Sequence, residues 1–335
     1  MITKTMQIGS DPQVTLTAYI HEPSAELSNI DKRPAVLVFP GGGYRVCSDR
    51  EGEPVALGYV AEGYHAFILR YTVGKKDVFR QAFKDAEAAM ETIISHAGDW
   101  HVDTEKIAVT GFSAGGHLAA ALGTMGKRRP AALILGYPCI LKSTGAILGG
   151  DVPGLDGQVD GQTPPAFLFS TAADELVPIQ NTLAFASAMA EAKRPFEAHI
   201  FQEGRHGLSV AKPHSSAGVR YMVDARVAAW FGMSAEWLKL QFGEFDYSQE
   251  TNIPGVRTEF DRYGVDVALS ELWKNPQCKA IVIGHLPMFA DENAVQKALP
   301  YSLRVISNYS EDMLSQLLLE KLDVLLRGVP VKRND

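Results

Sequence analysis

Cysteine is scarce in this sequence, with three residues, Cys47, Cys139 and Cys278, in a chain of 335. An odd number at wide spacing provides neither a disulfide framework nor the closely spaced ligands of a zinc site. We therefore expect free thiols, a reducing compartment and no bound metal.

Long apolar runs and clustered positive charge are lacking as well. No run approaches the roughly 18 apolar residues that a membrane helix needs, and residues 1–7 contain no apolar stretch typical of a signal peptide. The formal net charge is -7, whereas surfaces that bind nucleic acid or anionic membranes need clustered lysine and arginine. The sequence therefore predicts a cytoplasmic protein that binds neither nucleic acid nor membranes.

The remaining composition is that of an ordinary globular protein, with 46% hydrophobic and 21% charged residues. A chain of 335 residues is long for one core, so a main domain with a smaller companion is expected. After about residue 235 the regular pattern gives way to aromatic and turn residues without a clear period. The predicted organisation is a main domain at 1–235, a linker at 236–265 and a small all-helical module at 266–335.

Apolar runs of strand type alternate with amphipathic segments through the main domain. Strands that alternate with helices form parallel sheets with right-handed crossovers, and short apolar strands suit a sheet covered on both faces. The sequence therefore predicts a doubly wound, mostly parallel α/β sheet. The predicted strands are 13–20 at an edge, 34–39, 65–71, 106–110, 131–136, 165–171 and 196–201, and the predicted helices are 51–62, 78–97, 114–122, 179–192 and 216–231.

The last helix of the module carries the clearest terminal signals. Ser310 is expected to cap it, Glu311 and Asp312 favour its positive end, and Gly328 is expected to stop it. One apolar stripe is expected to pack within the module. It consists of Leu314, Leu317, Leu318, Leu322, Leu325 and Leu326.

A candidate nucleophile lies in Gly111-Phe112-Ser113-Ala114-Gly115, between a predicted strand and a predicted helix. A serine in such a sharp turn is lifted to the top of the sheet, and the residues two positions away must be small because strand and helix nearly touch. The first amides of the helix are aimed at the reacting carbonyl oxygen. We therefore predict that Ser113 is a catalytic nucleophile.

Two loops supply the partners of this serine. His206 lies in a glycine-flanked loop directly after the last strand, at the sheet edge where Ser113 is expected, whereas His117 lies one helical turn after the serine and is badly placed to face its hydroxyl. Asp174 follows the preceding strand and would hold the imidazole in the correct tautomer. Glu175 is the neighbouring rival for this role.

Backbone donors for an oxyanion are predicted in two places. Ala114, which follows the nucleophile, supplies one N–H group, and the loop Pro40-Gly41-Gly42-Gly43-Tyr44 supplies the other, with Gly42 preferred and Gly43 second. Glycines let the backbone approach the substrate closely and adopt positive φ. A phosphate-binding loop is disfavoured because no Gly-Lys-Ser/Thr follows.

Several further motifs occur in the same order. They are Phe-Pro-Gly-Gly-Gly-Tyr at 39–44, Ser-Asp-Arg-Glu-Gly-Glu at 48–53, Leu-Arg-Tyr at 69–71 and, after Asp103, Gly-Phe-Ser-Ala-Gly-Gly-His-Leu at 111–118. With them the sequence resembles the esterase/lipase branch of the α/β-hydrolase superfamily over residues 1–233, and most of all the small acetyl-esterase and xylan-esterase-like enzymes of bacteria. The resemblance implies hydrolysis of short acyl esters, often acetyl groups on sugars, without a cofactor.

Departures from that pattern bear on the choice of substrate. Lipase-type members have histidine before the triple glycine, where this chain has Phe39-Pro40, and no sizeable cap precedes the first strands. The insertion at 143–163 is expected to cover the site instead. Residues 266–328 are weakly similar to a helical module at the end of some bacterial carbohydrate-active enzymes, with an expected role in homo-oligomerisation or docking.

Other functions use the same residues. A peptidase of the prolyl-oligopeptidase type shares the order serine, acid, histidine, although this chain lacks the propeller-sized domain of such enzymes. Haloperoxidase-like and acyltransferase reactions also share it, and a non-catalytic binding protein on a hydrolase fold would need a damaged triad. The sequence favours an ester hydrolase whose partner is a small-molecule or oligosaccharide ester.

Overall fold

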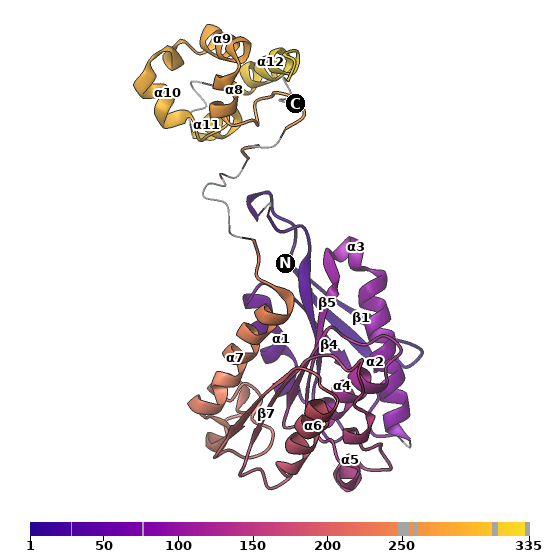
Figure 1. Cartoon of the computed structure of the whole chain (residues 1–335). Coiled ribbons are helices and arrows are strands. Elements are labelled where there is room, and N and C mark those ends of the chain that lie inside the picture. Colours follow the sequence, from indigo (N-terminus) through magenta and orange to yellow (C-terminus); the bar gives the residue numbers. More distant parts are fainter. Residues whose placement is uncertain are drawn as a thin grey trace. The chain divides into compact units, whose positions relative to one another are not determined.

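The chain forms two compact units in the computed structural model (Figure 1). The first comprises Met1–Glu22 and Asp31–Glu244, and the second comprises Pro23–Ile30 and Phe245–Asp335. The residues that the structure describes are 1–27, 29–75, 77–246, 253, 255–257, 260–309 and 314–331.

An eight-stranded sheet forms the centre of the first unit. Its strand order is β1-β2-β4-β3-β5-β6-β7-β8, in which β2 runs antiparallel to both neighbours and all other pairs are parallel. The prediction of a doubly wound, mostly parallel sheet is therefore confirmed. The strands are β1 (Ile2–Gln7), β2 (Thr15–Ile20), β3 (Arg33–Phe39), β4 (His65–Arg70), β5 (Val102–Phe112), β6 (Ala132–Gly136), β7 (Ala166–Thr171) and β8 (Phe196–Phe201).

Strand β1 was not among the strands predicted from the sequence. β1 reads Ile-Thr-Lys-Thr-Met-Gln, and all of its residues except partly buried Met6 are exposed, so it has no apolar run to reveal it. It pairs with β2 along its whole length. The prediction that residues 13–20 form an edge strand is therefore wrong, because β1 occupies that edge.

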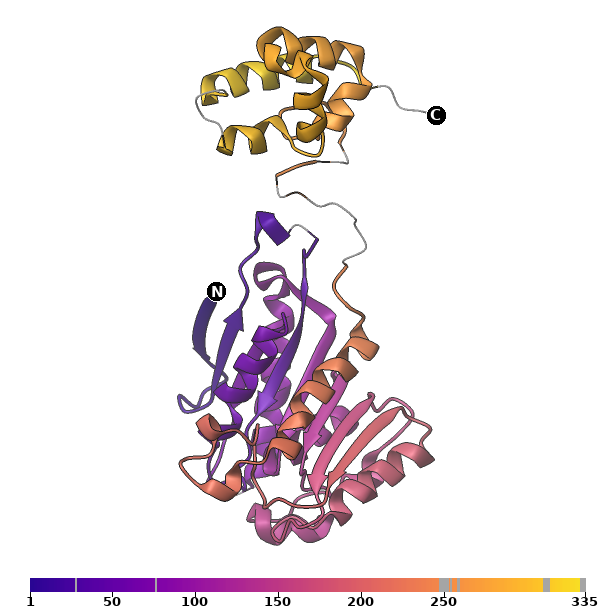
Figure 2. The same ribbon diagram turned by 90° about the vertical axis from the view of Figure 1, so that its left-hand side faces the viewer.

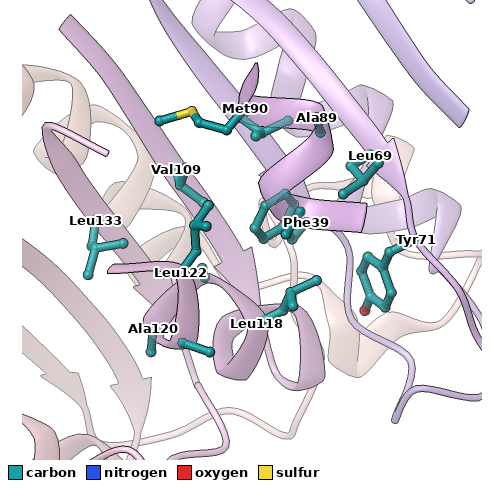
Figure 3. Close-up of a cluster of buried hydrophobic side chains, with 14 of the residues drawn as sticks. Phe39, Leu69, Tyr71, Ala89, Met90, Val109, Leu118, Ala120, Leu122 and Leu133 are labelled. Carbon is teal, nitrogen blue, oxygen red and sulfur yellow. The ribbon is translucent and has the colours of Figure 1, made fainter. Parts of the chain in front are cut away.

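Helices cover both faces of the sheet (Figure 1 and Figure 2). Figure 3 shows one of the two cores, in which Phe39, Leu69 and Val109 of three neighbouring strands face Met90 and Leu118 of two helices. Within the described ranges, no helix is both long and apolar enough to cross a membrane. One face carries α2 (Val78–Ser95), α3 (Ala97–Trp100), α4 (Ala114–Met125) and α6 (Gln180–Glu191), the other carries α1 (Glu53–Ala61) and α7 (Ala225–Phe242), and the short α5 (Gly145–Leu148) lies in the insertion.

The helix α7 is displaced from its predicted range of 216–231. Two short 3-10 turns occupy the residues before it, and Asp224 begins the helix by accepting hydrogen bonds from its first amides. The helix continues past residue 235 because Trp237 and Leu238 are buried in the core against the sheet. The first residues of the predicted linker thus belong to the main unit.

The second unit is all-helical in its described part and has its own core. Buried Leu322 and Leu326 contribute to this core as predicted, whereas Leu317 is 78% exposed and unpredicted Leu319 is buried. The predicted cap Ser310, with Glu311 and Asp312, lies outside the described residues, and Ser315 caps the last helix instead. The helices are α8 (Leu269–Lys274), α9 (Pro276–His285), α10 (Glu292–Ala298), α11 (Leu303–Tyr309) and α12 (Gln316–Arg327).

The two sides of α12 should respond differently to truncation. Leu322→Ala is expected to lower the free energy of unfolding of the second unit by about 2–5 kcal/mol, because it leaves a cavity in the core. Leu317→Ala, on the exposed side of the same helix, should change it by less than about 0.5 kcal/mol. Urea unfolding followed by circular dichroism measures both values, and equal losses would contradict the packing described above.

Candidate active site

Ser113 occupies a sharp turn between β5 and α4. Its φ of 53° and ψ of -115° lie in a region that residues with side chains rarely adopt. A Cβ atom on Gly111 would lie 2.2 Å from the carbonyl oxygen of Gly115, and one on Gly115 would lie 2.0 Å from that of Phe39. Strand and helix therefore touch around the serine, and the two flanking glycines cannot be replaced without moving the backbone.

Ser113, His206 and Asp174 come together at the carboxyl ends of β5, β7 and β8. The distance from Ser113 Oγ to His206 Nε2 is 2.8 Å, and that from His206 Nδ1 to Asp174 Oδ2 is 2.7 Å. The three residues are separated by up to 93 positions in the chain. The predicted nucleophile, base and acid thus form one hydrogen-bonded series.

The surroundings of Asp174 orient the imidazole. Its side chain is 1% exposed, and its Oδ1 accepts the N–H groups of Leu176 and Val177, both at 2.9 Å. The other carboxylate oxygen is left to accept the Nδ1–H of His206, so Nε2 of the ring can accept the serine proton. Glu175, the rival acid, is exposed.

The glycine loop presents N–H groups beside the serine. Gly42 has φ 131° and Gly43 has φ 63°, and a Cβ on Gly42 would lie 2.2 Å from the carbonyl oxygen of Val46. Among the described residues, the N–H groups of Gly42 and Gly43 have no acceptor. Ala114 is the first residue of α4, where N–H groups have no partner within the helix. Within the described ranges, the three predicted donors therefore have unpaired N–H groups, and their role toward an oxyanion stays a prediction.

His117 anchors the insertion behind the nucleophile. Burial lowers its pKa to about 4, so the ring is neutral and has one N–H group. The ring donates this group from Nε2 to the carbonyl oxygen of Pro153 at 3.0 Å, and its Nδ1 accepts the hydroxyl of Tyr44 at 3.0 Å. The base of the insertion is closed by the N–H of Leu155, which donates to the carbonyl oxygen of Ile140 at 2.9 Å.

Three polar residues near the site were not assigned a role from the sequence. Glu51 is 3% exposed and accepts the Gly41 N–H at 2.8 Å and the Tyr137 hydroxyl at 2.6 Å. Arg50 donates to the carbonyl oxygen of Gly207, beside His206, at 2.6 Å. Glu51 lies in one of the motifs quoted above, but a partner 86 residues away leaves no local signal.

Comparison with known proteins gives matches across the first unit. The family model described as BD-FAE matches residues 20–134. The structure of MGS-M1, an α/β hydrolase from a Medee basin deep-sea metagenome library, is 44% identical with a TM-score of 0.68, and the match covers 72% of this chain and 97% of that one. An acetyl ester-xyloside bifunctional hydrolase from Caldicellulosiruptor lactoaceticus is 32% identical with a TM-score of 0.58, over 68% of this chain and 88% of that one.

The matches with curated relatives cover only part of each relative. An acetylxylan esterase of Xylanibacter ruminicola is 28% identical over 233 residues, which are 62% of this chain and 48% of the esterase. The chain spans less than half of the length of the curated relatives that it matches. The likeness to MGS-M1 over nearly its whole length shows that the chain belongs to the α/β-hydrolase family. Its matches include esterase-like members of that family.

The contact between α4 and β3 can be tested at Gly115. Gly115→Ala is expected to cost about 1–3 kcal/mol through overpacking, which lowers the melting temperature by roughly 2–10 °C. Gly98→Ala is the matched control, because a Cβ at Gly98 meets no atom within 4 Å. Thermal unfolding of both variants decides the matter: a Gly115 variant as stable as the control would mean that strand and helix are not in contact.

Proposed function

We propose that this chain is a serine carboxylesterase that hydrolyses short-chain acyl esters, with acetyl groups on carbohydrates as its substrates. The observation that carries the proposal is the hydrogen-bonded series from Asp174 through His206 to Ser113, next to two unpaired glycine N–H groups. A nucleophile, a base oriented by a buried acid and donors for an oxyanion are the parts that acyl transfer requires.

In the acylation half-reaction, Ser113 Oγ attacks the ester carbonyl carbon while its proton passes to His206 Nε2. Negative charge develops on the carbonyl oxygen, where the N–H groups of Gly42, Gly43 and Ala114 stabilise it. The imidazolium, stabilised by Asp174, then gives its proton to the departing alcohol oxygen. The products of this half-reaction are a free alcohol and an acyl-enzyme.

Deacylation repeats the same steps with water as the nucleophile. His206 takes a proton from the water molecule as its oxygen attacks the acyl carbon. Collapse of the second tetrahedral intermediate breaks the bond to Ser113 Oγ, which recovers the proton from His206. A carboxylic acid leaves, and the enzyme returns to its starting state without any cofactor.

The acetyl group and the sugar are the finer part of the proposal. They are supported by the acetylxylan esterase and the acetyl ester-xyloside hydrolase that the chain resembles. The insertion approaches the glycine loop, because the carbonyl oxygen of Ile147 lies 3.4 Å from the position of a Cβ on Gly43, and we infer that it limits the room for the acyl group. A short acyl group needs little room beside the glycine loop.

Purified protein should hydrolyse p-nitrophenyl acetate faster than the octanoate and should deacetylate acetylated xylo-oligosaccharides. Ser113→Ala is expected to lower kcat by about 10⁴-fold or more, because it removes the nucleophile and leaves the fold intact. Spectrophotometric assays across the ester series measure this. Cleavage of peptide amides in preference to esters would favour a peptidase, and failure of a fluorophosphonate to label Ser113 would reject the proposed nucleophile.

The assignment of the acid is tested by two neighbouring residues. Asp174→Asn should lower kcat by about 10³–10⁴-fold, because an amide cannot hold the required imidazole tautomer. Glu175→Gln should leave kcat within about twofold, since that side chain is exposed. Steady-state kinetics on the preferred ester compare the two, and the reverse order of effects would transfer the role to Glu175.

A further inference from the structure

Glu51 is a buried acidic residue that takes no part in the proposed reaction steps. Both of its carboxyl oxygens act as acceptors, Oε2 for the Gly41 N–H and Oε1 for the Tyr137 hydroxyl. This is the pattern of a carboxylate, whose hydrogen bonds are stronger than those between neutral groups. Burial, together with the charge of Glu51, raises the pKa of Tyr137 well above its usual value, so the phenol keeps the proton that it donates.

Gly41, the first glycine of the loop, lies in close contact with both the Glu51 carboxylate and Ser113. A Cβ on Gly41 would lie 2.7 Å from Glu51 Oε2 and 3.1 Å from Ser113 Cβ. The carbonyl oxygen of Gly41 in turn accepts the N–H of Ser48 at 2.9 Å. That carbonyl belongs to the peptide unit that carries the Gly42 N–H, so the direction of this N–H depends on how Gly41 is held.

Tyr137 extends the same contact to the loop of the histidine. Its hydroxyl accepts the N–H of Ser209 at 2.9 Å, and its ring lies edge-on to that of His206, with the centroids 5.1 Å apart. Arg50, beside the carboxylate in sequence, holds the carbonyl oxygen of Gly207. The glycine loop and the histidine loop therefore meet at one buried carboxylate and its tyrosine.

We propose that Glu51 is a positioning residue that sets the direction of the oxyanion donors, and that Tyr137 couples this setting to the loop of His206. The inference rests on the proposed function, since it assigns a role within the same reaction. Glu51 touches neither the reacting atoms nor the acyl group; it acts through Gly41. Its effect must therefore be felt in the transition state, where the oxyanion exists, rather than in binding of the ester.

The test uses Glu51→Gln and Tyr137→Phe in the full chain. A glutamine can accept through one atom only, so either Gly41 or Tyr137 loses its acceptor, while phenylalanine removes a single hydroxyl from the network. We expect kcat to fall by about 10–100-fold in each variant, with KM within about twofold, because misaligned donors weaken transition-state stabilisation. The Ki of a trifluoromethyl ketone, which forms a tetrahedral adduct with serine, should rise by the same factor as kcat/KM falls.

A second tyrosine–glutamate pair, Tyr19 and Glu53, is the control for the loss of such a hydrogen bond. The Tyr19 hydroxyl donates to Glu53 Oε1 at 2.6 Å, the same length as the bond between Tyr137 and Glu51. Glu53→Gln and Tyr19→Phe should leave kcat and the Ki of the ketone within about twofold. The melting temperature and the fraction of Ser113 labelled by a fluorophosphonate are measured for every variant, so that kcat is expressed per folded, active molecule.

The outcomes separate this inference from the function on which it rests. If wild-type protein is labelled at Ser113 but hydrolyses none of the esters, the proposed substrate class fails, and the inference is judged on the rate of labelling, which should fall 10–100-fold in the Glu51 variant. An unchanged kcat or labelling rate, a rise in KM without loss of kcat, or equal losses in the Glu53 control would overturn the role of Glu51. Wild-type protein that is neither labelled nor active would overturn both proposals.

Discussion

The close packing of α4 against the carboxyl end of β3 is the constraint on which the candidate site depends. Because Gly115 lies directly on the carbonyl oxygen of Phe39, the turn at Ser113 is forced into its strained conformation and the glycine loop begins beside it. Ser113 and the first residues of the glycine loop are thus placed by one backbone contact. The free energy gained by burying both faces of the sheet offsets the cost of this strained conformation.

The buried acidic groups near the site are held by hydrogen bonds from the closely packed chain around them. Main-chain N–H groups, rather than cations, satisfy one oxygen of Asp174, and a main-chain N–H and a phenol satisfy Glu51. A carboxylate that accepts a hydrogen bond from rigid backbone keeps one orientation, whereas an ion pair with a flexible lysine would not fix its orientation. The neutral ring of His117 is also held in one orientation, because burial leaves it a single N–H group to donate. Orientation, more than net charge, is what these buried groups provide.

Much of this could be predicted from the sequence, and the failures have physical reasons. Strands covered on both faces are apolar throughout, so 34–39 was recognised as β3 to within one residue. β1 is exposed and mixed in polarity, and it was missed. The serine, histidine and aspartate were predicted because each follows a strand, and parallel strands end at one edge. The pair of Glu51 and Tyr137 could not be predicted, because only the folded sheet brings them together.

The closed base of the insertion has a consequence for how such a site can diversify. The bond between Leu155 and Ile140 joins the two ends of residues 141–154, and the bond from His117 to Pro153 anchors this segment near its second end. Lengthening a loop whose ends are already joined costs little conformational entropy, about 0.6 kcal/mol for each doubling. Residues between these anchors can therefore be exchanged, added or removed while the turn at Ser113 stays unchanged. The fold therefore separates a segment whose sequence can vary from the elements that hold Ser113, His206 and Asp174.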